Sequence, residues 1–202
     1  MPTRPIQLRR PRIAPDLAHR LPPGQFPTQR WPVLHHGSVP HFDEDTWDFW
    51  VFGEVERPFR CNWTEFQALP RITVNADMHC VTRWTTFDNE WEGVAAAEIA
   101  GRSGVKRDAN VVVFHAENDY TANIPIDVFL GSDVVLAMTH NGAPLTPEHG
   151  APLRALVPSR YAWKSAKWLR GIEFLVDDRP GFWENYGYHN NADPWMEERF
   201  AD

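Results

Sequence analysis

The segment HCVTRW at residues 79–84 contains the residues best suited to chemistry. A cysteine thiolate is a nucleophile and a ligand for soft metals, and the guanidinium of Arg83 would stabilise that form of Cys80. If the segment ends a strand, His79 and Cys80 point to opposite faces and are not expected to bind one metal together. The alternative is that Cys80 is a buried, inert cysteine, which is the interpretation we adopt for Cys61.

A second candidate segment runs from His149 to Lys167. Arginine can bind a phosphate through two hydrogen bonds, and lysine adds a compact positive charge. Residues 151–172 contain five arginines or lysines and no acidic residue, although the whole chain has a net charge of −7. These residues predict a pocket for one small anion, and a solvated basic loop is the alternative.

Histidines form the third candidate. His35 and His36 are adjacent in a proline-rich stretch, where they could contact a bound group or lie exposed to water. His115, His140 and His189 have no companion at metal-ligand spacing, so we interpret them as structural.

Composition restricts the classes of protein that remain. The 202 residues include only two cysteines, so no disulfide framework holds the fold. The acidic balance argues against a nucleic-acid-binding surface. No run approaches the roughly 18 to 20 apolar residues of a membrane-spanning helix, so we expect no membrane insertion and a cytoplasmic location.

The elements that must position these residues are short. Nine prolines before residue 45 predict an extended N-terminal arm over 1–45 that packs on a body over 46–202. The body is predicted to be α+β, with mixed, mostly β structure and short helices. We expect a helix with Thr64 as its N-cap, a helix over 95–102, and strands over 47–55, 71–79, 111–115, 133–140, 153–157 and 171–176.

Five stretches together resemble a known family. They are PVLHHGSVP from residue 32, VFGEVERPF from 51, ADMHCVTRWTTFDNEWEGV from 76, PEHGAPLRALVPSRYAWKSAKWLRGIEFL from 147 and DRPGFWENYGYHNNADPW from 178. In order and spacing the chain is similar to the sulfite oxidase family of molybdopterin-dependent oxidoreductases, in its small, single-domain, haem-free bacterial form.

The resemblance implies roles for the three candidate groups. Cys80 would bind molybdenum through its thiolate, and Arg83 would support that thiolate and help to position an anionic substrate. The cofactor, molybdenum with one molybdopterin, would be bound by His35, His36, Cys80, His149, Arg154, Ser165, Ala166 and Lys167.

The resemblance also implies an enzyme that transfers an oxygen atom to or from a small molecule, such as a sulfite-like anion or a sulfoxide-like compound. Electrons would pass to or from a separate partner, because no haem or flavin motif is present. Two alternatives remain from the residues alone. One is a non-catalytic module that binds an anion or nucleotide through residues 149–170, and the other is a hydrolase that uses Cys80 and a histidine.

Overall fold

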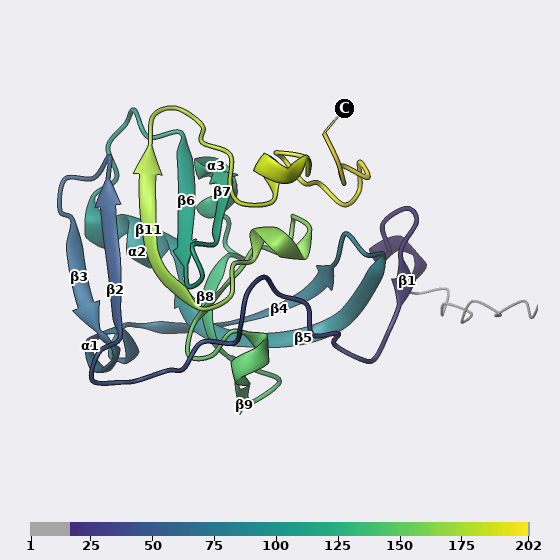
Figure 1. Cartoon of the computed structure of the whole chain (residues 1–202), viewed down its shortest axis with the longest axis horizontal. Helices are drawn as coiled ribbons and strands as arrows, with labels where there is room; N and C mark the ends of the chain where they lie inside the picture. Colours follow the sequence, from purple (N-terminus) through teal and green to yellow (C-terminus); the bar gives the residue numbers. More distant parts are fainter. Residues whose placement is uncertain (1–16, 202) are drawn as a thin grey trace, which may run out of the picture.

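A computed structural model describes residues 17–201 and places all of their strands in two sheets (Figure 1). The first sheet has the order β1-β5-β8-β10, with β4 paired to β5 and β9 paired to β8. Its strands are β1 (Phe26–Pro27), β4 (Arg71–His79), β5 (Trp84–Ala95), β8 (Val135–His140), β9 (Ala143–Pro144) and β10 (Arg154–Leu156). The second sheet has the order β3-β2-β11-β6-β7. Its strands are β2 (Asp48–Gly53), β3 (Phe59–Asn62), β6 (Val111–Ala116), β7 (Thr121–Pro125) and β11 (Leu169–Leu175).

Helices are few and short. The α-helices are α1 (Trp63–Gln67), α2 (Ala96–Ser103) and α3 (Ile126–Phe129). Single 3-10 turns occur at η1 (Ala18–Arg20), η2 (Pro147–His149), η3 (Ala162–Lys164) and η4 (Glu184–Tyr186). The predicted α+β class is confirmed. Within residues 17–201, no helix is long and apolar enough to cross a membrane.

Most of the expected elements form where the apolar pattern placed them. Strand β4 has the predicted bounds, and α2 is displaced by one residue from its predicted bounds. The pattern did not predict β5, the longest strand, because its sequence WTTFDNEWEGVA is rich in polar residues and lacks a regular alternation. Two register shifts interrupt the pairing of β5 with its neighbours, and such irregularities weaken a period-two pattern.

The predicted cap of α1 is wrong. Thr64 lies inside the helix, and Asn62 is the N-cap. The Asn62 side chain accepts a hydrogen bond from the Glu65 backbone at 2.9 Å, and the Glu65 carboxylate accepts one from the Asn62 backbone at 2.9 Å. This reciprocal pair satisfies two backbone donors that a helix start leaves free.

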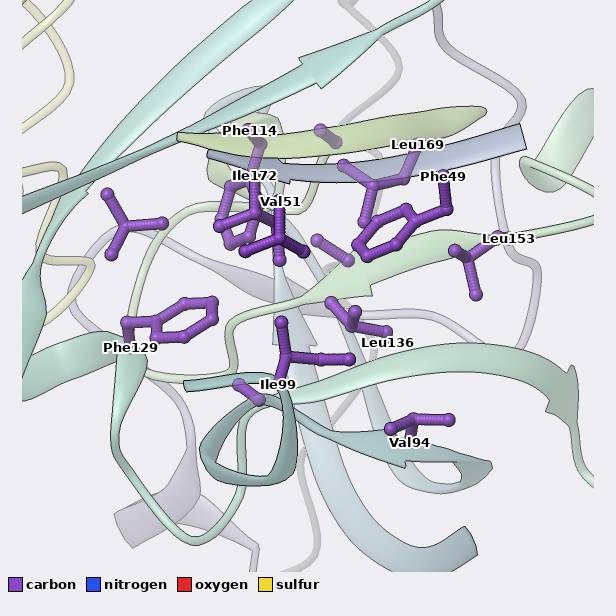
Figure 2. Packing of buried hydrophobic residues seen from close by; sticks show 14 of the residues in the cluster. Phe49, Val51, Val94, Ile99, Phe114, Phe129, Leu136, Leu153, Leu169 and Ile172 are labelled. Carbon is purple, nitrogen blue, oxygen red and sulfur yellow. The ribbon is translucent and has the colours of Figure 1, made fainter. Parts of the chain in front are cut away.

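The main core lies between the two sheets, and α2 packs against it. Figure 2 shows Phe49, Val51 and Ile172 of β2 and β11 on one side of this core, with Leu136 of β8 and Ile99 of α2 opposite. All five side chains are at most 1% exposed. Burial of this apolar surface is the main stabilising contribution to the packing of the two sheets.

The other face of the first sheet supports a second, smaller cluster. Along β8, Leu136 faces the main core, whereas its neighbours Val135 and Ala137 belong to the second cluster. Alternation along a strand produces this division. Cys80 and Trp84 lie in the same second cluster, so the predicted chemistry is on the face of the sheet opposite the main core.

Residues 17–45 pass the end of the first sheet at which β5 begins. Phe26 and Pro27 pair in parallel with the start of β5, and the chain then continues to Trp31, which packs on the second cluster. The division of the chain into an arm over 1–45 and a body over 46–202 stays a prediction, and residues 1–16 lie outside the described residues.

The cap of α1 gives a test of the fold. We expect Asn62→Ala to lower the free energy of unfolding by about 1 kcal/mol, because the Glu65 backbone N–H loses its side-chain acceptor. Thr64→Ala, the matched control two residues further along the chain, should change it by less than about 0.5 kcal/mol. Urea unfolding followed by circular dichroism measures both, and equal losses in the two variants would contradict the observed cap.

Candidate functional site

Cys80 lies at the base of a tight hairpin between β4 and β5. The Cys80 backbone N–H donates to the Trp84 carbonyl at 2.9 Å, and the Arg83 N–H donates to the Cys80 carbonyl at 2.9 Å. These two hydrogen bonds across the hairpin therefore fix the backbone conformation at Cys80. The buried Gln25 adds a third contact by donating from Nε2 to the Cys80 carbonyl at 3.1 Å.

The sulfur of Cys80 is buried and polarised. Cys80 is 7% exposed, and the Thr82 hydroxyl donates to Sγ at 3.2 Å. Burial raises the pKa of the Cys80 thiol above its ordinary value, while the hydrogen bond from Thr82 and the charge of Arg199 oppose that rise. In the described part of the chain, no histidine hydrogen-bonds this sulfur.

Arg83 does not lie where the sequence suggests. It adopts a φ of 77°, and its exposed side chain is not part of the cavity described below. A left-handed residue commonly ends a three-residue hairpin loop, so its backbone serves the turn. The support of Cys80 by Arg83 stays a prediction, whereas Arg199, which the sequence did not suggest, is a nearby cation whose charge opposes the rise in the pKa of Cys80.

A cavity of about 340 Å³ opens beside Cys80, within the size range of ligand sites in proteins. It brings together segments that are far apart in the chain. Among the residues that the sequence singled out, the lining includes His35, His36, Cys80, Arg154, Ser165, Ala166 and Lys167.

The lining also includes several aromatic side chains, which suit a flat heterocyclic ligand. These are Trp31, Trp84, Tyr120, Trp163, Trp168, Trp183 and Tyr188. The sequence interpretation assigned no chemistry to the tail that contains Trp183 and Tyr188. The signals for these walls were the high number of tryptophans, ten in the chain, and the family resemblance of the stretch from residue 178.

Arg154 provides a buried positive charge in this cavity. It is 1% exposed, and its guanidinium donates to the carbonyls of His149, Ala155 and Ser165 at 3.0 to 3.3 Å. Burial lowers the pKa of Arg154 to about 10, so it remains protonated at neutral pH. Three backbone carbonyls orient the group and leave further N–H donors free for a ligand.

Lys167 adds a second cation. Its ammonium donates to the Glu148 carbonyl at 2.7 Å, which leaves two donors. Burial, followed by the charge of Arg154, lowers the pKa of Lys167 to about 7. Although the chain has 27 aspartates and glutamates, none lines the cavity among the described residues. A buried and a half-buried cation without a carboxylate favour an anionic ligand.

Gly150 allows the two cations to lie close together. Its φ is +106°, and a Cβ there would lie 3.1 Å from the Cβ atoms of both Arg154 and Lys167. A larger residue would therefore be strained in its backbone and would crowd both side chains.

His149 lies outside the cavity lining, against Trp31. The rings of these two residues stack with centroids 3.7 Å apart, and His140 packs on Trp31 at 4.4 Å. Burial, with nearby positive charges second, lowers the pKa of both histidines to about 4, so they are neutral at pH 7. His149 thus anchors the Trp31 wall, and its predicted direct contact with the cofactor stays a prediction.

His35 and His36 are exposed at the cavity mouth. The His35 ring lies 5.2 Å from Trp168, and the His36 ring lies 4.2 Å from Phe182. His115 and His189 are instead paired with Glu173 and Glu198.

Comparison with known proteins assigns the family. Residues 36–183 match the family described as "Oxidoreductase molybdopterin binding domain". The chain belongs to this family. It is 49% identical to the uncharacterized oxidoreductase YuiH of Bacillus subtilis, over 92% of this chain and 94% of that protein.

More distant relatives are larger proteins. The chain is 30% identical to a nitrate reductase of Hordeum vulgare over 79% of its own length, which is 21% of the reductase. The sulfane dehydrogenase SoxCD of Paracoccus pantotrophus has the same fold, with a TM-score of 0.68 at 21% identity. That match covers 80% of this chain and 48% of the SoxCD chain. The family and the fold confirm the expected sulfite oxidase-like, molybdopterin-dependent oxidoreductase.

The cavity of this molybdopterin-binding oxidoreductase fits its cofactor. Molybdopterin combines a pterin ring with a phosphate on its side chain, and the cavity offers aromatic walls with Arg154 and Lys167. Within residues 17–201, no cluster of three or more His, Cys, Asp or Glu side chains could hold a metal ion. A metal at Cys80 would therefore need further ligands from the bound cofactor.

The cation pair predicts pH-dependent anion binding. We expect cofactor-free protein to bind sulfate more weakly as the pH rises above about 7, by up to about tenfold per unit, because Lys167 must take up a proton to pair with the anion. Sulfate keeps its charge over this range. Calorimetric titration between pH 6 and 9 measures the affinity.

Two variants complete this experiment. Lys167→Met should bind sulfate weakly at every pH. Lys106→Met, a control on the exposed Lys106–Glu54 pair, should behave as the wild type. If the wild-type affinity did not change with pH, or Lys106→Met changed it as much as Lys167→Met, the assignment of the anion site would be wrong.

Proposed function

We propose that the chain is a molybdenum-dependent oxidoreductase that transfers an oxygen atom to or from a small substrate, with Cys80 as the protein ligand of the metal. One observation carries this proposal: a buried thiol and two cations without a carboxylate partner line the same aromatic cavity. The resemblance seen in the sequence and membership of the molybdopterin-binding family support it.

Each residue has a distinct part in holding the cofactor. Cys80 would bind the metal, and metal binding would remove the thiol proton despite the raised pKa. Arg154 and Lys167 would bind the phosphate of the pterin. The bound cofactor supplies the oxygen-transfer chemistry, and the protein supplies binding and orientation.

The neighbouring backbone would fix the pterin edge. Ser165 and Ala166 directly precede Lys167 and line the cavity, and their carbonyls already accept from Arg154 and from the Ala155 N–H. The Ser165 hydroxyl accepts from Val157 at 2.9 Å and keeps its own proton to donate. His35 and His36 would contact the cofactor from the cavity mouth.

The substrate would be small, a sulfite-like anion or a sulfoxide-like compound, because the cavity must hold both cofactor and substrate. Electrons would pass through a separate carrier. A cytoplasmic location also remains a prediction of the sequence.

The alternatives account for fewer observations. A non-catalytic module that binds an anion through residues 149–170 explains Arg154 and Lys167 but gives no reason for Cys80 in the same cavity. A cysteine hydrolase needs a base beside the nucleophile, and among the described residues the hydrogen-bond partner of Sγ is Thr82.

The proposal is tested by metal and pterin content. Protein made in a host that synthesises the molybdenum cofactor should contain both, in equal amounts. Cys80→Ser should lose the metal and turnover yet retain part of the pterin, since the cations remain. Metal is measured by mass spectrometry and pterin by fluorescence after oxidation.

Cys61 supplies the control. It is half-buried away from the cavity, and burial raises the pKa of its thiol to about 11. Cys61→Ser should leave metal and pterin content unchanged. Wild-type protein without either component would refute the proposed function, and full metal content in Cys80→Ser would remove Cys80 as the ligand.

A further inference from the structure

Arg199 is a buried cation with too few partners. The residue is 7% exposed, and Nη1 donates to the Val81 carbonyl at 2.5 Å. Its Nε and Nη2 atoms are buried without a hydrogen-bond partner. The nearest carboxylate, Glu197, lies 3.9 Å from Nη2 and is itself about half exposed, so it compensates the charge poorly.

The tail holds this side chain firmly in place. The Arg199 carbonyl accepts from the His189 N–H at 3.3 Å, and Tyr188 and Phe200 form an isolated β-bridge. The guanidinium lies 4.9 Å from the centre of the Tyr161 ring. Its position is therefore set by backbone pairing and by a cation–π contact.

The place where Arg199 is held lies beside the hairpin of Cys80. Val81, whose carbonyl accepts its hydrogen bond, directly follows the cysteine in the chain. A buried cation is costly unless an anion lies nearby. A buried thiolate is likewise costly unless a cation lies nearby. The two groups would compensate each other once the sulfur of Cys80 is bound to a metal as a thiolate.

We propose that Arg199 is a positioning residue for the metal site: its positive charge stabilises the negative sulfur of Cys80 and raises the reduction potential of the bound metal. This inference rests on the proposed function, and it assigns to the C-terminal tail the part that the sequence suggested for Arg83. A fixed positive charge favours the reduced, more negative state, and burial prevents water from screening it.

Burial distinguishes Arg199 from the other arginine near Cys80, since Arg199 is only 7% exposed. Arg83 is the matched cation in the same hairpin, but its side chain is exposed. Exposure to water screens its field, so burial and not charge alone distinguishes the two arginines.

The test uses the cofactor-loaded protein and four forms: wild type, Arg199→Gln, Glu197→Gln and Arg83→Gln. Metal and pterin content are measured first, and the midpoint potential of the metal is then measured by a redox titration followed by electron paramagnetic resonance. Arg199→Gln should lower the potential, changing the ratio of reduced to oxidised metal by about tenfold, ~59 mV for one electron. Arg83→Gln should leave it near the wild-type value.

Glu197→Gln keeps the test decisive if Arg199→Gln does not fold. It removes a half-exposed carboxylate 3.9 Å from Nη2 and leaves Arg199 less compensated. The potential should therefore rise, by less than Arg199→Gln lowers it, and a merely structural role would not produce this change of opposite sign. The inference is overturned if Arg199→Gln retains its metal with an unchanged potential, if Arg83→Gln shifts the potential as much, or if Glu197→Gln lowers it. Wild-type protein without metal would instead refute the proposed function.

Discussion

The fully buried guanidinium of Arg154 is the constraint on which the cavity depends. Three backbone carbonyls, from His149, Ala155 and Ser165, hold it in place and thereby join three segments of the chain. A buried charge needs such partners, because the cost of removing it from water is large. The carbonyl groups are neutral dipoles, so the site keeps the positive charge of Arg154. Since the described residues bring no carboxylate to the lining, the positive charge remains available for an anion, and Lys167 beside it strengthens the same preference.

The remaining walls come from the ends of the chain. Trp31 enters from the N-terminal side and stacks on His149, while Trp183 and Tyr188 enter from the C-terminal tail. A buried ion pair between Lys164 and Glu184, at 2.5 Å, fastens this tail to the body, and the Trp163 indole donates to the same glutamate at 2.8 Å. Breaking such a pair leaves one charge uncompensated, so the tail contributes to the structure of the cavity as well as to its surface. The cavity is thus closed by segments that contribute little to either sheet.

Much of the fold could be predicted from local pattern. Strand β4 has clear apolar alternation because one of its faces packs on a core, whereas β8 begins as a continuous apolar run because both of its faces are buried. The Asn141-Gly142 dipeptide, a common hairpin turn sequence, connects β8 to β9. Strand β5 escaped prediction because its pairing with β4 and β8 is irregular and many of its residues are polar. The start of α1 was misplaced because Thr64 is a common capping residue type, whereas in the structure Asn62 is the N-cap and forms a capping box with Glu65.

The sequence by itself determined the family, the candidate cysteine Cys80 and the segment that supplies the cations of the anion site. These depend on residue types in a fixed order along the chain. Seven of the predicted site residues line one cavity. Only the tertiary structure decided which charges are buried. Arg83 is adjacent to Cys80 in sequence yet exposed, whereas Arg199 is far along the chain yet buried against the carbonyl of Val81. The effect of a charge on another group depends on the distance between them in the folded protein and on the exposure of the charge to water. Neither quantity can be read from separation along the chain.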